Sequence, residues 1–231
     1  MKLLNAGNSK TVKGESFGFK TYGIHLSPSD TSGHNVCKWA SRGCRAACLD
    51  TAGRGAMSNV QKARIAKTRF LFEEPESFLA QLRKEIRSAT RSAERHNLVP
   101  CFRLNLTSDV AWEDMGIIED FPELTFYDYT KSAARVSQFI EGKLPSNYHL
   151  TYSRSERRGD DLTCFSFLKA GGNVAVVFRG SLPETWQGFP VINGDETDLR
   201  FLDRPGAVIG LVEKGRAKRD ASGFVVEGGQ E

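Results

Sequence analysis

Three of the five cysteines lie within twelve residues, where their thiols could share one metal: Cys37, Cys44 and Cys48 in HNVCKWASRGCRAACL. Thiolates are ligands of both zinc and iron–sulfur clusters. A structural zinc site has four ligands, so zinc would need one more from His34, His25, Cys101 or Cys164. Three thiolates alone suit a [4Fe–4S] cluster with one iron left open for a cofactor. We therefore expect an iron–sulfur cluster at the three clustered cysteines. The alternatives are zinc, with His34 as a possible fourth ligand, and three thiols that bind no metal.

Polar side chains lie at or just after the ends of several expected strands. A pocket for a nucleoside-sized cofactor could be lined by Asn105, Ser108, Asp109, Ser153 and Glu156. Asp109 could accept a hydrogen bond from a ribose hydroxyl or act in catalysis, and Lys131 could bind a carboxylate or phosphate. The alternatives are a helix N-cap for the Ser-Asp pair and an ordinary exposed lysine.

An acidic loop near the carboxyl end supplies another candidate for catalysis. Asp195 and Asp198 could serve as base or nucleophile, or could pair with Arg200 and Arg204. The residue order of a calcium loop is absent. The predicted catalytic residues are therefore Asp109, Lys131 and Asp195.

The elements that must position these residues alternate along the chain. Strand-like stretches are expected at 19–26, 101–106, 124–129, 148–152, 173–178, 191–192 and 207–212, and helices at 55–72, 75–96, 133–141 and 160–170. Such alternation predicts a parallel α/β architecture. Because polar residues recur after strand ends, we predict a full or partial parallel (β/α) barrel, TIM-like, with a doubly wound sheet as the alternative. One domain is expected over 1–231, with an N-terminal extension at 1–18 and a flexible tail at 227–231.

Composition predicts a soluble protein of the cytoplasm. The chain has 231 residues, 39% hydrophobic and 26% charged, and no apolar run approaches the ~18 residues of a membrane span. No signal peptide or membrane partner is expected. The net charge of +4 is compatible with DNA or RNA as a partner. Many basic residues lie between 54 and 95, where the alternative is a solvated helical face with glutamate partners.

Several motifs together resemble the phage family called gene product 88, and this resemblance implies that the cytoplasm would be that of the host. They are GHNVCKWASRGCRAACL, RLNLTSD, FYDYTKS, NYHLTYSRSE, NGDETDLRFLD and GLVEKGRAKRD. A looser resemblance, to radical SAM iron–sulfur enzymes, lies in three cysteines on the loop after the first strand, and it implies the partial (β/α) barrel of those enzymes. Ser108-Asp109 and Thr130-Lys131 match the order of strand-end motifs in related phage proteins. The spacing C-x6-C-x3-C departs from the usual C-x3-C-x2-C of radical SAM enzymes.

Three functions follow as expectations. The first, implied by the radical SAM resemblance, is an iron–sulfur enzyme that uses S-adenosylmethionine and acts on a nucleoside or nucleic acid. The second is an enzyme that resembles base-exchanging transglycosylases, with structural zinc and Asp109 or Asp195 as nucleophile. The third is a non-enzymatic, metal-containing nucleic-acid-binding protein that uses its basic helices.

Overall fold

The computed structural model describes residues 1–7 and 11–229 and shows a mixed α/β protein with mostly parallel strand pairing. The chain divides into two compact units. The first unit comprises Met1–Lys38, Asp50–Asp128 and Pro145–His149, and the second comprises Trp39–Leu49, Tyr129–Leu144 and Leu150–Glu231. Each unit is described by itself below.

The strands of the first unit follow one another in the order β1, β2, β3, β4. β2 (Phe19–Ile24) pairs in parallel with β3 (Val99–Arg103), which pairs in parallel with β4 (Thr125–Thr130). β1 (Leu4–Asn5) adds to β2 in antiparallel orientation, and η1 (Val12–Phe17) is a 3₁₀ helix leading into β2. The expected N-terminal extension therefore contributes a strand to this unit.

The second unit is organised around β6 (Asn173–Arg179). The order is β5 (Tyr148–Ser153), β6, β9 (Val208–Val212) and β8 (Phe189–Asn193), all in parallel. β7 (Thr185–Trp186) adds antiparallel to β8. β10 (Val225–Glu227) pairs with the second half of β6, while β5 pairs with its first half. The expected tail thus begins at the end of a strand, and Gly229 accepts a hydrogen bond from Ser181 at 2.8 Å; residues 230–231 lie outside the described residues.

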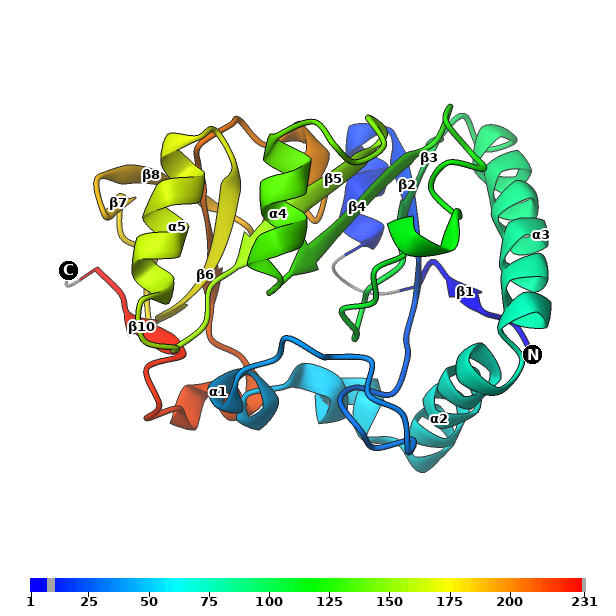
Figure 1. The fold of residues 1–231 in the computed structure, drawn as a ribbon, viewed down its shortest axis with the longest axis horizontal. Helices are drawn as coiled ribbons and strands as arrows, with labels where there is room; N and C mark the ends of the chain where they lie inside the picture. Colours follow the sequence, from blue (N-terminus) through cyan, green and yellow to red (C-terminus); the bar gives the residue numbers. More distant parts are fainter. Residues whose placement is uncertain (8–10, 230–231) are drawn as a thin grey trace. The chain divides into compact units, whose positions relative to one another are not determined.

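The four expected helices are present with similar bounds: α2 (Ser58–Glu73), α3 (Pro75–Glu94), α4 (Ala133–Ile140) and α5 (Asp160–Lys169). A short helix in the cysteine segment, α1 (Arg42–Ala46), was not predicted. The helix expected over 55–72 is instead a 3₁₀ helix, η3 (Gly53–Ala56), followed by α2. Pro75 suits the first turn of α3, which needs no donor there. α4 and α5 lie side by side in the second unit (Figure 1).

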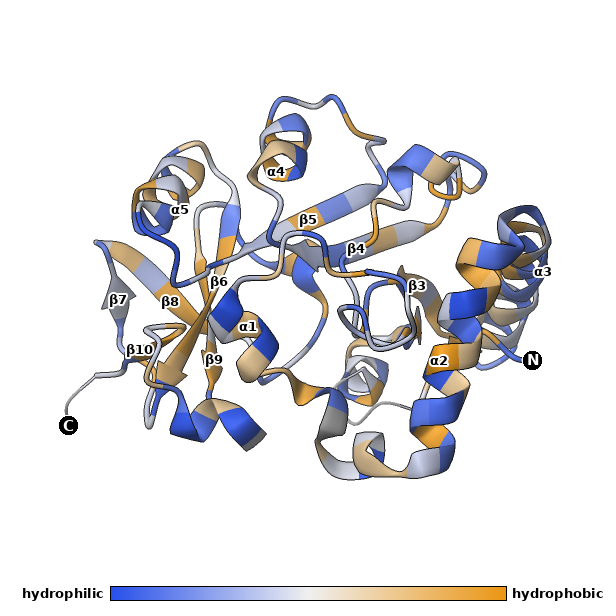
Figure 2. Ribbon diagram, turned by 60° about the horizontal axis from the view of Figure 1, so that its bottom comes forward, coloured by the Kyte–Doolittle hydropathy of each residue, from blue (hydrophilic) through white to orange (hydrophobic). Residues whose placement is uncertain are grey.

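Each unit has an apolar core built from its strands and helices. In the first unit the rings of Tyr22, Phe102 and Phe126 stack in succession across β2, β3 and β4. In the second unit the apolar strands β6 and β9, orange in Figure 2, pack with α5 through Val176, Val208 and Leu168. Cores of this kind hold the strand ends in fixed positions, which is what a site on the following loops requires.

The barrel is not confirmed. Within the described residues, pairings in the first unit begin at an antiparallel strand, β1, and those in the second unit end at another, β7. A TIM-barrel or radical SAM fold is not shown. None of the helices in the described ranges is long and apolar enough to cross a membrane.

Candidate functional site

In the first unit, the loop after β3 is wound around the side chain of Asn105. Its Oδ1 accepts hydrogen bonds from Ser108 Oγ at 2.7 Å and from the Val110 amide at 2.9 Å. Its Nδ2 donates to the Val110 carbonyl at 2.9 Å. These contacts close the loop into a tight ring. Asn105 and Ser108, both expected to bind a cofactor, therefore build the loop on which Asp109 is carried.

A buried carboxylate from the neighbouring strand holds this loop in place. Asp128, only 1% exposed, accepts from the Asn105 amide at 2.8 Å, from Asn105 Nδ2 at 3.1 Å and from Tyr148 Oη at 2.9 Å. Burial of a charge is tolerated where several donors satisfy it. Sequence reasoning missed Asp128. The signal was a charged residue in the middle of the aromatic strand TFYDYT, where only a satisfied carboxylate can be buried.

The first of the clustered cysteines lies against the same loop. Cys37 Sγ is 3.9 Å from the Thr107 carbonyl oxygen, and the amide of Asp109 donates to the Val36 carbonyl at 2.8 Å. The Cys37 amide is fixed by Asn35 Oδ1 at 2.8 Å. The first unit thus brings Cys37 together with the predicted residues of the 105–110 loop.

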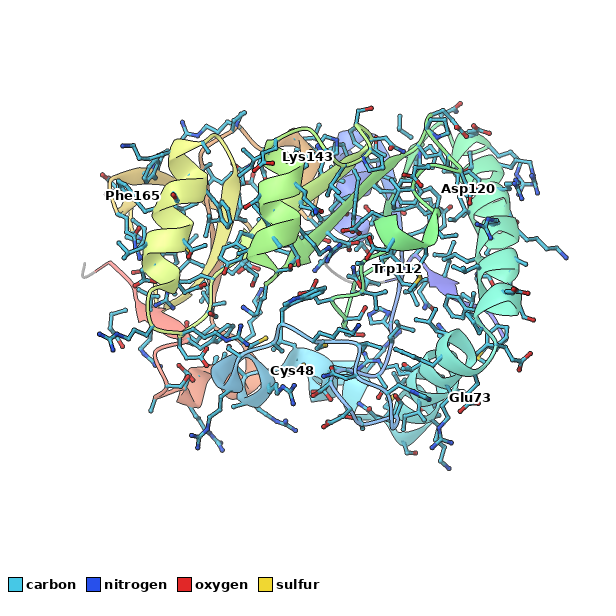
Figure 3. All side chains as sticks on the ribbon, in the orientation of Figure 1. Cys48, Glu73, Trp112, Asp120, Lys143 and Phe165 are labelled. Carbon is cyan, nitrogen blue, oxygen red and sulfur yellow. The ribbon has the colours of Figure 1, made fainter. Side chains whose placement is uncertain are left out.

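His34, the possible fourth ligand, contacts two residues at the end of α2. Its ring stacks on Phe72 with the centroids 4.5 Å apart and the planes within 3°. Its Nε2 lies 3.9 Å from a carboxylate oxygen of Glu73, which is labelled in Figure 3. His34 therefore contacts the end of α2.

In the second unit, a carboxylate after β5 holds the helix that carries Cys44. Glu156 Oε2 accepts from Ser41 Oγ at 2.6 Å, and Oε1 accepts from the Gly43 amide at 2.7 Å. Ser41 is the N-cap of α1 and accepts from the Cys44 amide at 3.2 Å. Burial pushes the pKa of Glu156 upward, but hydrogen bonds from Ser41 and Gly43 and the charge of Lys131 outweigh it and leave the pKa below its usual value.

Gly43 is required by the lack of space around α1. A Cβ atom at this position would lie 2.4 Å from Ser222 Oγ, 2.7 Å from Phe224 Cβ and 2.8 Å from Glu156 Oε2. Gly43 lies within α1 and is absent from the glycines with positive φ. The first turn of α1 thus sits directly on the segment that precedes β10.

Lys131 joins the ends of two strands in the second unit. Its Nζ donates to the Ser153 carbonyl at 3.0 Å, Ser153 Oγ at 3.1 Å and the Arg154 carbonyl at 2.7 Å. It also lies 4.9 Å from the centre of the Phe224 ring. An ammonium group has three protons to donate, and these acceptors can take all of them. Lys131 and Ser153 therefore position the strand end from which Glu156 extends.

The residues just before α1 are held by two arginines. The guanidinium of Arg135 lies 5.7 Å from the centre of the Trp39 ring, and Arg157 Nη2 donates to the Ala40 carbonyl at 3.2 Å. Sequence reasoning singled out none of these residues. Their contacts join segments more than ninety positions apart, a separation that no local pattern reveals.

The acidic loop lies along a different part of the second unit. Asp195 forms an ion pair with Lys214 at 2.6 Å and accepts from the Val212 amide at 3.1 Å. It follows β8, which lies three strand positions from β5, or about 14 Å at the usual strand spacing. Arg200 forms its ion pair with Asp203 at 3.2 Å. The structure therefore does not bring Asp195 together with Glu156.

The clustered thiols suit a soft metal by their chemistry, and the two core cysteines do not. Cys37, Cys44 and Cys48 are partly exposed, whereas Cys101 and Cys164 are buried; Figure 3 labels Cys48 just beyond α1. Burial, together with Asp160, raises the pKa of Cys164, which keeps it a protonated thiol. All five cysteines are present as thiols. Across residues 1–7 and 11–229, no three His, Cys, Asp or Glu side chains are grouped as a metal would need.

His25 is also a poor candidate for the fourth ligand. Burial lowers its pKa to about 4, and the charges of Arg64, Lys67 and Arg103 add to the effect. A metal ion beside these three cations would meet strong repulsion.

These features define a class: a mixed α/β protein with parallel strands, whose strand-end loops are held by carboxylates. The family model Gene product 88 matches residues 2–228. The chain therefore belongs to the Gene product 88 family of phage proteins. No curated protein and no solved structure matches it, and the resemblance to radical SAM enzymes is not shown.

Proposed function

We propose that this chain is a phage iron–sulfur enzyme in which Cys37, Cys44 and Cys48 ligate the cluster. The observation that carries the proposal is the attachment of α1 to Glu156, which fixes the segment bearing Cys44 while its thiol stays partly exposed. Ligands whose supporting residues are hydrogen-bonded in place bind metal with less loss of conformational entropy. The core cysteines play no part in this proposal.

A cluster with one open iron would bind a small-molecule cofactor, for which S-adenosylmethionine is the candidate, and supply it with an electron. The chain's own residues have simpler tasks. Asn105 and Ser108 fix the loop that carries Asp109, and Asp109 would accept hydrogen bonds from a nucleoside ribose. Lys131 and Ser153 hold the end of β5, three residues before Glu156. The proposed scaffold is a partial barrel, and the proposed substrate is a nucleoside or nucleic acid.

Metal analysis of anaerobically purified protein tests this proposal. We expect iron and sulfide in the protein, with a brown colour that Cys37→Ser, Cys44→Ser and Cys48→Ser each abolish. Cys164→Ala is the control, because it removes a thiol from the core and should keep the iron once circular dichroism confirms folding. Colourless wild-type protein after reconstitution with iron and sulfide would overturn the proposal.

Zinc at the same thiols is the second candidate, with base exchange on a nucleic acid as the reaction. The favouring observation is that Asp109 lies on a loop closed by Asn105 and attached to Val36, next to Cys37. A fixed, partly exposed carboxylate suits a nucleophile. Stoichiometric zinc, together with base exchange that Asp109→Asn abolishes and Asp195→Asn spares, would establish it; exchange unaffected by Asp109→Asn would exclude it.

A further inference from the structure

Helix α3 and its C-cap residue, Arg95, carry a row of four exposed cations along one face. Lys84, Arg87, Arg91 and Arg95 follow one another at spacings of three, four and four residues. Residues at these spacings are neighbours on a helix surface. Eleven residues of helix give the row a length of about 16 Å. The row is therefore a continuous positive stripe.

The opposite face of α3 is buried, which fixes the stripe toward solvent. Phe78, Leu82 and Ile86 are fully buried, and Ala89 and Ala93 continue this face. Figure 2 accordingly colours α3 with both hydrophobic orange and hydrophilic blue. Rotating the helix to hide the cations would expose this core, so the stripe is a fixed surface.

Glu94 is exposed beside Arg91 and Arg95 and offsets one of the four positive charges, whereas Glu85 and Asp120 are engaged by other partners. Glu85 accepts the amides of Leu3 and Leu4 at 2.9 and 2.8 Å, so it serves the fold. Asp120, labelled in Figure 3, pairs with Arg83 at 2.6 Å. Within the described residues, the side chains of Lys84, Arg91 and Arg95 have no ion-pair partner, and Arg87 packs 5.3 Å from the centre of the Phe121 ring. A solvated face with glutamate partners does not describe this stripe.

The favourable interaction of cations with the helix dipole explains the presence of only some of these four residues. Cations near the carboxyl end of a helix gain about 0.3–1 kcal/mol from its dipole, an effect confined to the last turn. This accounts for Arg91 and Arg95, whereas Lys84 and Arg87 lie further from that end. A shallow, open depression at the carboxyl end of the stripe is lined by Ser88, Arg91, Glu94 and Arg95. A polyanion could contact the stripe along its length.

We propose that the stripe formed by Lys84, Arg87, Arg91 and Arg95 binds the phosphate backbone of a nucleic acid. A row of about 16 Å passes roughly five phosphates of one strand of a DNA duplex. An anionic membrane fits less well, because surface helices that bind membranes insert an apolar face, and that face of α3 is already buried. The inference rests on the proposed function only for the class of polymer, and it requires no metal.

Salt-dependent DNA binding by the full-length, metal-free protein tests the stripe. Fluorescence anisotropy with a short labelled DNA duplex gives the slope of log K against log salt. Removing two phosphate contacts in Arg91→Gln/Arg95→Gln should reduce the magnitude of that slope by about 2. We also expect at least a severalfold weaker affinity at low salt.

The matched control is Arg158→Gln/Arg204→Gln, which removes the same charge from exposed positions of the second unit. We expect this variant to keep the wild-type slope. Equal losses in both double variants, or absence of DNA binding by the wild type, would overturn the proposal, as would binding to phosphatidylserine vesicles but not DNA. Equal binding of duplex RNA would support recognition of the backbone alone. The DNA-binding assay uses metal-free protein. Its outcome is therefore independent of the metal analysis, and either proposal can be overturned without the other.

Discussion

Asp128 in the first unit and Glu156 in the second perform the same task in different surroundings. Each is a carboxylate that accepts hydrogen bonds from a backbone amide and from side chains of a loop or a neighbouring strand. Asp128 is 1% exposed and lies among the core strands. Glu156 is partly exposed at the surface of the second unit. The contacts are alike, and their surroundings differ.

Because of this difference, we expect Asp128 to affect the stability of the first unit and Glu156 to affect mainly the position of α1. A buried carboxylate that loses a partner leaves an unsatisfied charge in the core, so Asp128 supports the whole first unit. Around Glu156, water can replace a lost partner, so its loss should affect mainly α1. The comparison thus predicts a global effect in one unit and a local effect in the other.

The largest effect is expected for Asp128→Asn, which keeps the size of the side chain and removes its charge. The amide group would oppose one of the donors from Asn105 or Tyr148, so unfolding should become easier by about 3 kcal/mol. Urea denaturation measures this change. Asp30→Asn, at an exposed turn, should leave the midpoint unchanged. Equal stability of both variants would show that Asp128 is not a determinant of the fold.

A smaller effect is expected for Gly43→Ala, which tests how tightly α1 is seated. The added methyl group must displace Ser222 or Phe224, at a cost of about 1–3 kcal/mol for overpacking. Thermal unfolding and the rate of Cys44 alkylation should both report the change. Gly7→Ala is the matched control, because a Cβ there meets nothing within 4 Å. Unchanged alkylation in Gly43→Ala would contradict close packing at α1.

The smallest effect on stability is expected for Glu156→Gln, because solvent screening leaves about 1 kcal/mol for the lost charge-assisted hydrogen bond. The local effect is sharper. A pKa lowered in the folded state means that the contribution of Glu156 is present above its usual pKa of 4.5 and is lost as pH falls through the folded value. Hydrogen exchange of the α1 peptide, corrected for intrinsic rates, should show protection lost on acidification in the wild type.

In Glu156→Gln the same peptide should exchange faster at neutral pH and should not show that acid step. Glu141→Gln, which removes an exposed partner of Lys143, is the control and should behave like the wild type. Retention of the acid step in Glu156→Gln would assign it to another carboxylate.

Much of the architecture follows from local pattern. Short stretches rich in strand-forming residues predicted β2, β3, β4, β5, β6 and β9 and the middle of β8. The apolar spacing of Phe78, Leu82 and Ile86 predicted α3. β1, β7 and β10 have two or three residues each, too few for a periodic pattern. The predicted barrel is not confirmed. Whether a sheet closes into a barrel depends on contacts between distant segments, which no local sequence pattern encodes.

The sequence predicted which residues of the candidate site lie together better than it predicted what each of them does. The structure brings Lys131, Ser153 and Glu156 together in one unit and Asn105 and Ser108 together in the other. Their roles as supports depend on partners such as Ser41, 115 residues from Glu156. The need for glycine at position 43 likewise comes from distant residues, because a Cβ there would meet Ser222 and Phe224. The metal, the cofactor and the nucleic-acid substrate remain predictions.

The packing of α1 on the segment before β10 has a consequence for the order in which the protein is made. Cys44 leaves the ribosome early, but Glu156, Ser222 and Phe224 are synthesised more than a hundred residues later. Helix α1 therefore reaches its final position only when nearly the whole chain has emerged. Until then the packing that leaves Cys44 only partly exposed in the folded protein is incomplete, so its thiol is more open to oxidants and to competing metals during synthesis than afterwards.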